Sequence, residues 1–279
     1  MLVTDVTMAV ESGTTADGIT QLRRRWAVNA PSAAIQLVHG IGEHSGRYGH
    51  VGSFFAERGY DVAMFDNRGF GESGGKRGHV DSFSVFLDDI EEGLAGRRQL
   101  GAPTVLFGHS LGGLMSAAYL VSDRPQPDLA ILSAPALAAE VPLWQKVAAP
   151  ILGRFAPKFF VASEIDGVGL SRDTEVQKAY VADPLLVAGA TAGLGQQVFT
   201  AMKQTNANLQ KLSVPTYVFH GDEDPVVPQA ASLPLRDLAN VDYRSWPGLR
   251  HECLNEPERE EVMSEIHDWL RSKLASLQA

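Results

Sequence analysis

A serine flanked by glycines separates a short apolar run from a helical pattern, and this junction constrains the fold more than any other segment. Residues 104–107 read Thr-Val-Leu-Phe, Gly108-His-Ser-Leu-Gly112 follows, and a helical pattern continues from 111 to 122. The arrangement matches G-x-S-x-G in the strand–turn–helix context that this motif requires. Side chains in place of the glycines would collide with the neighbouring strand or helix. We therefore expect Ser110 at the tip of a strained turn above the sheet edge, as a candidate nucleophile.

Further short apolar runs have the length of strands that are buried on both faces of a sheet. With the run that precedes Gly108, the expected strands lie at residues 33–38, 61–65, 104–107, 129–132, 216–219 and 241–246. Helical patterns lie between or after them at residues 50–58, 83–97, 111–122, 229–238 and 257–274. Residues 6–28, with a turn at Thr15-Ala-Asp-Gly18, are expected to form a hairpin of edge strands. Strands that alternate with helices predict parallel β-α-β units in one sheet, which is the α/β class.

The alternation of strands and helices breaks in the second half of the chain. Between residues 140 and 212 strand-like runs are few, and prolines stand at positions 142, 150, 157 and 184. A helical insertion between two core strands is the simplest interpretation. The predicted organisation is therefore a core in two parts, residues 1–139 and 213–279, with a helical cap insertion at 140–212.

Residues 141–161 form an apolar stretch whose charged side chains are Lys146, Arg154 and Lys158. In a chain with a net charge of −9, a locally basic apolar stretch is compatible with contact at a lipid interface. The alternative is that these residues cover the core or line a pocket, as most amphipathic helices do. Both interpretations stand at this point.

Composition limits the classes of protein to which the chain can belong. The 279 residues include 24 Lys and Arg against 33 Asp and Glu, and this acidic balance argues against a nucleic-acid partner. The single cysteine, Cys253, excludes an internal disulfide and a cysteine-rich zinc site. Neither a signal peptide nor an apolar run of ~18 residues is evident, so we expect a cytoplasmic protein.

Two other glycine motifs compete with the first one. Gly71-Glu-Ser-Gly-Gly75 also fits G-x-S-x-G, and residues 69–74 spell G-x-G-x-x-G after a strand. Lys76-Arg-Gly78 follows them, whereas a nucleophile turn and a dinucleotide site both need a helix at that point. We therefore reject Ser73 as the nucleophile and expect a loop rather than a dinucleotide site.

A serine hydroxyl needs a base that removes its proton and an acid that orients the base. The chain order expected with this motif is serine, acid, histidine, which leaves His220, His251 and His267. His220 ends a predicted strand before an acidic loop, and His267 lies within the last helix. We predict His251 as the base, because it lies in a loop between the strand 241–246 and that helix.

The candidate acids lie together in His220-Gly-Asp-Glu-Asp-Pro-Val-Val-Pro228, directly after a strand. Asp222, Glu223 and Asp224 compete for the role. We predict Asp224, because the rigid Pro-Val-Val-Pro segment that follows can hold it at the sheet edge, and Asp222 is the fallback. At least two of the three acidic residues then serve as turn residues that satisfy backbone donors.

Acyl transfer develops an oxyanion that needs two preorganised donors. The backbone N–H of Leu111 directly follows the serine at the start of a helix. His39-Gly-Ile-Gly42 follows the strand 33–38, and its glycines allow the Ile41 N–H to point inward. An ordinary glycine turn is the alternative. The serine, acid and histidine in the expected order favour Ile41 and Leu111 as the oxyanion hole.

Five motifs together resemble the monoacylglycerol lipases, which belong to the lysophospholipase-like group of the α/β-hydrolase superfamily. They are His39-Gly-Ile-Gly-Glu-His-Ser-Gly-Arg-Tyr48, Gly108-His-Ser-Leu-Gly112, Leu132-Ser-Ala-Pro135, Tyr180-Val-Ala-Asp-Pro-Leu185 and Trp246-Pro-Gly-Leu-Arg-His-Glu252. The resemblance covers residues 33–270, and Gly-Glu-His-Ser-Gly-Arg-Tyr is far more specific than G-x-S-x-G. It implies the α/β-hydrolase fold, with a mostly parallel central sheet, helices on both faces and a cap over an acyl-binding tunnel.

The resemblance also implies a polar pocket for glycerol, with contacts from Glu43 and Arg47 on the first loop and Tyr180 on the cap. A salt bridge between Glu43 and Arg47 that pins the loop is the alternative interpretation. The chain departs from the family pattern within residues 67–70, and Leu254 stands where some members carry a second histidine. These departures concern the selectivity for glycerol and leave the three predicted catalytic residues untouched.

We therefore expect a serine hydrolase that cleaves monoacylglycerol to fatty acid and glycerol through an acyl-enzyme, with no metal or organic cofactor. A carboxylesterase or lysophospholipase of broader specificity is the alternative within the same chemistry. A non-catalytic lipid-binding member of the fold is the alternative from another class. The expected partner is a small lipid ester, with peripheral contact to a lipid surface through the cap. Acyl chain length, positional preference and oligomeric state do not follow from the sequence.

Overall fold

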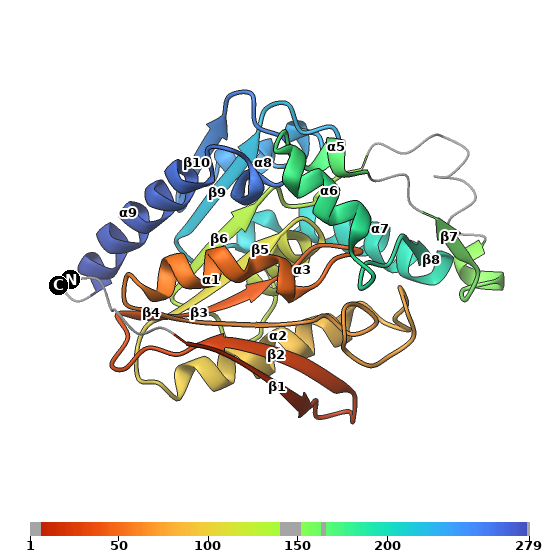
Figure 1. Cartoon of the computed structure of the whole chain (residues 1–279), viewed down its shortest axis with the longest axis horizontal. Coiled ribbons are helices and arrows are strands. Elements are labelled where there is room, and N and C mark those ends of the chain that lie inside the picture. Colours follow the sequence, from red (N-terminus) through yellow and green to blue (C-terminus); the bar gives the residue numbers. More distant parts are fainter. Residues whose placement is uncertain (1–6, 140–151, 163–165, 278–279) are drawn as a thin grey trace.

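A computed structural model of the chain describes residues 7–139, 152–162 and 166–277 and contains an eight-stranded sheet with helices on both faces (Figure 1). The strands follow the order β1-β2-β4-β3-β5-β6-β9-β10 across the sheet. Their bounds are β1 Met8–Thr14, β2 Thr20–Trp26, β3 Ala33–Val38, β4 Tyr60–Phe65, β5 Thr104–His109, β6 Leu129–Ser133, β9 Thr216–Gly221 and β10 Val241–Trp246. A separate ribbon pairs β7 (Phe160–Ala162) with β8 (Gly189–Thr191).

Six strands of the sheet run parallel, from β4 through β10 in the order above, whereas β2 pairs with both β1 and β4 in the antiparallel sense. The predicted α/β class with a mostly parallel sheet is therefore confirmed. The hairpin expected at residues 6–28 is present, but β2 also pairs with β4 and only β1 lies at the edge. The expectation of two edge strands was wrong, because the buried side chains of Leu22 and Trp26 give β2 an apolar face that packs inside.

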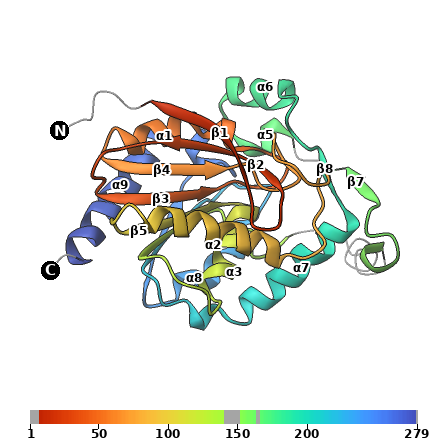
Figure 2. The same ribbon diagram turned by 90° about the horizontal axis from the view of Figure 1, so that it is seen from below.

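Helices cover both faces of the sheet, as the view in Figure 2 shows. They are α1 Gly49–Ala56, α2 Ser84–Arg98, α3 Leu111–Leu120, α5 Gly167–Leu170, α6 Thr174–Ala182, α7 Ala192–Asn206, α8 Leu233–Arg236 and α9 Arg259–Leu277. Phe107 of β5 packs in one hydrophobic cluster with side chains of α1 and α9, whereas its neighbour Leu106 packs in another with side chains of α2 and α3. This alternation is the two-residue period of a strand that is buried on both faces. None of the helices in the described ranges has the length and apolar character needed to cross a bilayer.

The chain between β6 and β9 supplies β7, α5, α6, β8 and α7, which lie toward the carboxyl ends of the core strands (Figure 1). Hydrogen bonds join it to the first core loop: the Val187 N–H donates to the Gly42 carbonyl at 2.8 Å, and His44 Nε2 lies 2.7 Å from Asp183 Oδ2. Its last helix, α7, packs into the same hydrophobic cluster as α3. Residues 141–151 of the apolar stretch lie outside the described residues. The cap boundaries at 140 and 212 stay predictions.

The turn between β5 and α3 has the strained backbone that its glycines predict. Ser110 has φ 55° and ψ −118°, in the positive-φ region that residues with a Cβ rarely adopt. A Cβ on Gly108 would lie 2.3 Å from the Gly112 carbonyl oxygen, and a Cβ on Gly112 would lie 2.2 Å from the Val38 carbonyl oxygen. Close approach of backbone to backbone therefore requires glycine at both positions.

Replacing Gly112 with alanine is expected to lower the free energy of unfolding by about 3 kcal/mol, because the new methyl group meets backbone carbonyls that cannot move aside. The matched control is Gly96→Ala in α2, where a Cβ meets no atom within 4 Å. That control is expected to stabilise the helix by up to about 1 kcal/mol. Urea denaturation followed by circular dichroism measures both changes. Equal stability of the Gly112→Ala variant and the parent would contradict the packing argument.

Candidate active site

Loops at the carboxyl ends of three parallel strands bring Ser110, Asp224 and His251 together. Ser110 follows β5, Asp224 follows β9 and His251 follows β10. His251 Nε2 lies 2.8 Å from Ser110 Oγ, and His251 Nδ1 lies 2.7 Å from Asp224 Oδ2. All three side chains are buried. The residues expected as nucleophile, acid and base are thus in hydrogen-bond contact, in the order that these roles require.

Both carboxylate oxygens of Asp224 have fixed partners. Asp224 Oδ1 accepts hydrogen bonds from the backbone N–H groups of Val226 at 2.8 Å and Val227 at 2.9 Å. These donors belong to the Pro-Val-Val-Pro segment that follows the acid in the sequence. They orient the carboxylate so that Oδ2 faces His251.

His220 is a second histidine in contact with this carboxylate, and the sequence pattern did not predict that contact. Its Nε2 lies 3.0 Å from Asp224 Oδ2, and its Nδ1 lies 2.7 Å from Ser232 Oγ. In the sequence, this contact could have been inferred only from the position of His220 at the end of the strand that Asp224 follows, four residues before Asp224. Asp222 instead accepts a hydrogen bond from the Gly248 N–H at 2.6 Å, which is the turn role considered for the competing acids.

Electrostatics favour an ionised Asp224 beside a basic His251. Burial raises the pKa of Asp224, but contacts with His251 and His220 outweigh it and hold the pKa well below the ordinary range of an aspartate. Burial likewise lowers the pKa of His251, but the Asp224 carboxylate raises it more, so this pKa lies above its ordinary value. With Nδ1–H donated to Asp224, the neutral ring presents Nε2 as the acceptor for the Ser110 hydroxyl.

His109 packs against the base. The ring centroids of His109 and His251 lie 4.8 Å apart, and His109 Nδ1 lies 3.1 Å from Ser133 Oγ. Burial, together with the neighbouring His251, lowers the pKa of His109 to about 4. His109 is therefore neutral near pH 7 and supports His251 without adding a second positive charge. His109 occupies the second position of the G-x-S-x-G motif. The motif accepts any residue at that position, so it does not predict the contact with His251.

A small pocket opens beside the serine hydroxyl. The predicted binding residues Glu43, Arg47 and Tyr180 lie in its wall. Ile41, Leu170 and Glu252 also line the pocket. Tyr180 belongs to α6, whereas Glu43 belongs to the loop after β3. The core and the segment between β6 and β9 therefore both contribute to the pocket.

The two backbone N–H groups expected to form the oxyanion hole belong to Ile41, which lines this pocket, and to Leu111, which directly follows Ser110. The Leu111 N–H begins α3, and the first N–H groups of a helix have no partner within it. The Ile41 N–H has no acceptor among the residues that the structure describes. Gly42 has φ 79°, which turns this loop next to the serine. Their role as oxyanion donors stays a prediction.

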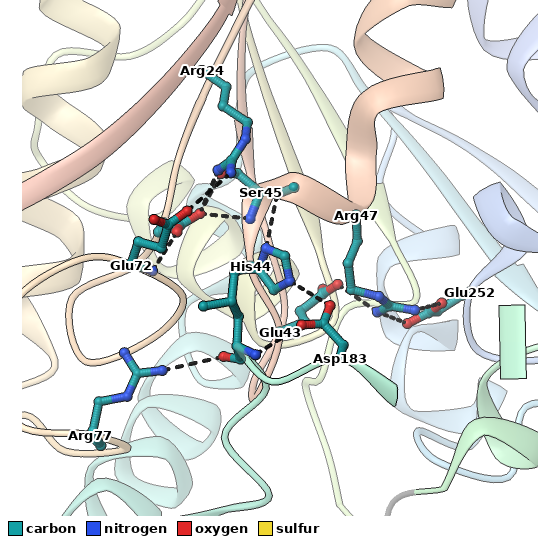
Figure 3. Close-up of polar contacts among 12 residues, drawn as sticks. Arg24, Glu43, His44, Ser45, Arg47, Glu72, Arg77, Asp183 and Glu252 are labelled. Carbon is teal, nitrogen blue, oxygen red and sulfur yellow. Dashed lines mark hydrogen bonds and ion pairs between the residues drawn. The ribbon is translucent and has the colours of Figure 1, made fainter. Parts of the chain in front are cut away.

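Glu43 and Arg47 fit both interpretations that the sequence left open. Arg47 Nη1 lies 2.9 Å from Glu43 Oε2, and the Arg47 guanidinium also contacts Glu252 with two hydrogen bonds of 2.6 and 2.8 Å (Figure 3). The guanidinium carbon lies 5.1 Å from the centre of the Tyr180 ring. Burial raises the pKa of Glu43, but Arg47 together with His109, His39 and Tyr48 outweighs it, and the pKa falls to about 2. Glu252 directly follows His251 in the sequence, but no local pattern there predicts its contact with Arg47.

The fold and these contacts define the class of protein. A serine at a strand–turn–helix junction, followed in the chain by an acid and a histidine at one sheet edge, is the arrangement of an α/β-hydrolase. Among residues 7–139, 152–162 and 166–277, no group of three or more His, Cys, Asp or Glu side chains is arranged to hold a metal ion.

Comparisons with known proteins identify the family. The family model described as serine aminopeptidase, S33, matches residues 29–258. The chain is 37% identical over 260 residues to a monoacylglycerol lipase of Mycolicibacterium smegmatis, covering 88% of this chain and 90% of that protein. It is 32% identical over 247 residues to a phospholipase of Bacillus subtilis, covering 85% and 94%. The crystal structure of a monoacylglycerol lipase from Paleococcus ferrophilus superimposes with a TM-score of 0.80 at 30% identity, covering 97% of this chain and 100% of that one.

The chain therefore belongs to the serine aminopeptidase S33 family of α/β-hydrolases, and the resemblance to monoacylglycerol lipases seen in the sequence is confirmed.

Replacing Asp224 with asparagine is expected to lower the pKa of His251 below its ordinary value. The carboxylate that stabilises the imidazolium is then gone, and burial, which favours the neutral ring, remains. NMR titration of the His251 ring proton measures the shift. The control is Asp242→Asn on the outer strand β10. This substitution removes the same charge from an ion pair with Lys273 of α9. An unchanged pKa of His251 in Asp224→Asn would contradict the electrostatic argument.

Proposed function

We propose that the chain is a serine hydrolase that cleaves the ester bond of monoacylglycerols to fatty acid and glycerol. The observation that carries this proposal is the hydrogen-bonded series from Asp224 Oδ2 through His251 to Ser110 Oγ, with distances of 2.7 and 2.8 Å. The substrate class rests on the similarity to the monoacylglycerol lipases of Mycolicibacterium smegmatis and Paleococcus ferrophilus.

The reaction passes through an acyl-enzyme. Ser110 Oγ attacks the ester carbonyl carbon while His251 Nε2 takes the hydroxyl proton, and Asp224 stabilises the resulting imidazolium. The imidazolium then gives that proton to the departing glycerol oxygen, and the acyl group stays on Ser110. A water molecule next loses a proton to His251 Nε2 and attacks the acyl carbon. Release of the fatty acid returns the proton to Ser110.

The pocket beside the nucleophile supplies the remaining contacts of the reaction. The N–H groups of Ile41 and Leu111 stabilise the oxyanion of both tetrahedral intermediates. Glu43, Arg47 and Tyr180 contact the glycerol hydroxyls, and their common position in the pocket wall supports this role. Carboxylates accept hydrogen bonds from a polyol, while guanidinium and phenol groups donate them.

A carboxylesterase or lysophospholipase of broader specificity is the second candidate, which the similarity to the phospholipase of Bacillus subtilis favours. A panel of mono-, di- and triacylglycerols and lysophospholipids of several acyl lengths separates the candidates by kcat/KM. We expect the highest kcat/KM for monoacylglycerols. A dominant turnover of lysophospholipid would reject the glycerol pocket.

Contact with a lipid surface is a further part of the proposal. Within the described part of the stretch 141–161, the side chains of Phe155 and Phe159 are 78% and 58% exposed. Arg154 and Lys158 are exposed beside them. Exposed aromatic rings next to basic side chains suit the interface of an anionic bilayer.

Sedimentation with vesicles that contain anionic lipid tests this contact at low salt. The double substitution Phe155→Ser and Phe159→Ser is expected to reduce the bound fraction several-fold, because it removes apolar area from the interface. Val10→Ser on β1, which also removes an exposed apolar side chain, is the control and is expected to bind like the parent. A parent protein that does not sediment with the vesicles would remove the lipid contact from the proposal.

Replacing Ser110 with alanine is expected to lower kcat by about 10⁴-fold or more and to abolish labelling by a fluorophosphonate probe. Ser73→Ala is the matched control, because Ser73 lies in the competing G-x-S-x-G segment and its hydroxyl bonds the Asp66 carbonyl at 2.7 Å. This control is expected to keep both activity and labelling. Undiminished ester hydrolysis by folded Ser110→Ala would refute the mechanism, and a folded parent that never labels would favour a lipid-binding module.

A further inference from the structure

The pocket beside Ser110 contains a cation whose hydrogen-bonding capacity is largely taken by the protein. Arg47 Nη1 donates to Glu43 Oε2 at 2.9 Å and to Glu252 Oε1 at 2.6 Å, and Arg47 Nη2 donates to Glu252 Oε2 at 2.8 Å (Figure 3). A guanidinium binds a phosphate best through two parallel N–H donors on one edge. The Glu252 carboxylate already occupies the edge of Arg47 that Nη1 and Nη2 form.

Neither carboxylate can leave Arg47 without losing other contacts. Glu43 Oε1 accepts hydrogen bonds from the backbone of its own loop at 2.6 Å and from the Tyr48 hydroxyl at 2.7 Å. Glu252 Oε2 also accepts one from Asn255 Nδ2 at 2.8 Å. The side chains of Glu43, Arg47 and Glu252 are each at most 10% exposed. A movement of Arg47 toward a ligand would therefore leave a buried carboxylate unpaired, which is costly.

The charge of this part of the wall is negative. Two carboxylates surround one guanidinium, and the ionised Asp224 lies behind His251. Burial limits the screening of these charges by water and salt. A phosphate monoester, which carries roughly −1.5 to −2 charge at neutral pH, would meet repulsion here, and Glu252 already occupies the Nη1–Nη2 edge of Arg47. An uncharged polyol meets hydrogen-bond acceptors instead.

We propose that Glu252, by holding Arg47 with both of its oxygens, makes the site reject leaving groups that carry a phosphate monoester and accept uncharged polyols. The inference rests on the proposed function, because it describes the leaving-group side of that same site. Glu252 acts through Arg47 and is a specificity-determining residue rather than a catalytic one. Removal of its charge makes the wall less negative and opens the Nη1–Nη2 edge of Arg47 to a phosphate.

The experiment compares 1-octanoylglycerol with 1-octanoylglycerol 3-phosphate, both below their critical micelle concentrations. Both substrates acylate Ser110 with the same group, and His251 serves both, so altered protonation of the base or partial unfolding cancels in the ratio of their kcat/KM values. We expect the parent to prefer the uncharged substrate by about 100-fold or more. Glu252→Gln is expected to reduce this preference by about 10-fold or more, chiefly through a lower KM for the phosphate substrate.

Two further variants separate the pocket from effects of net charge and of folding. Glu258→Gln removes the same charge from a partly exposed ion pair with Arg172, outside the pocket wall, and is expected to keep the parent ratio. Glu43→Gln removes the other carboxylate that pairs with Arg47. It is expected to shift the ratio in the same direction as Glu252→Gln, and it replaces that variant if Glu252→Gln does not fold.

The outcomes distinguish this inference from the proposed function. An unchanged ratio in the folded Glu252→Gln variant, or equal kcat/KM values of the parent for the two substrates, would overturn the inference and leave the proposed function intact. A parent that hydrolyses neither 1-octanoylglycerol nor longer monoacylglycerols would overturn the proposed function itself. A ratio that falls equally in Glu258→Gln would assign the effect to net charge and also overturn the inference.

Discussion

The parallel strands β5, β9 and β10 end at the same edge of the sheet, and the contacts of the candidate site depend on that alignment. Ser110 and His251 are 141 residues apart in the chain, yet their reacting atoms lie 2.8 Å apart because each residue follows the end of its strand closely. The site is rigid at both ends of the hydrogen-bonded series. Close packing of Gly112 against β3 holds the strained turn of Ser110, and two backbone N–H groups hold Asp224.

Buried charges occur in two groups that have different tasks. Asp224 raises the basicity of His251, whereas Glu43, Arg47 and Glu252 form part of the pocket wall beside Ser110. The loop after β10 serves both groups, since it supplies the base and, in the next position, the carboxylate that engages Arg47. Proton transfer and the proposed choice of leaving group are therefore linked through one short segment of backbone.

Most of the core could be predicted from the sequence, and the errors have physical causes. Buried parallel strands are short apolar runs, so β3 was predicted with its observed bounds. The hairpin was also predicted, but a strand's neighbour is a tertiary property, and the pairing of β2 with β4 could not be read from the alternation within it. Asp222 and Asp224 are equivalent as turn residues, and only the path of the backbone directs one of them toward His251.

The sequence by itself determined the α/β class, the elbow at Ser110 and the order of the three candidate catalytic residues. These follow from hydrophobic periodicity and from the steric need for glycine, which act over a few neighbouring residues. The tertiary structure alone decided that His220 reaches Asp224 and that Glu252 engages Arg47. The second of these contacts joins residues 205 positions apart, and it depends on how two loops face each other across the pocket, which no local pattern in either loop specifies.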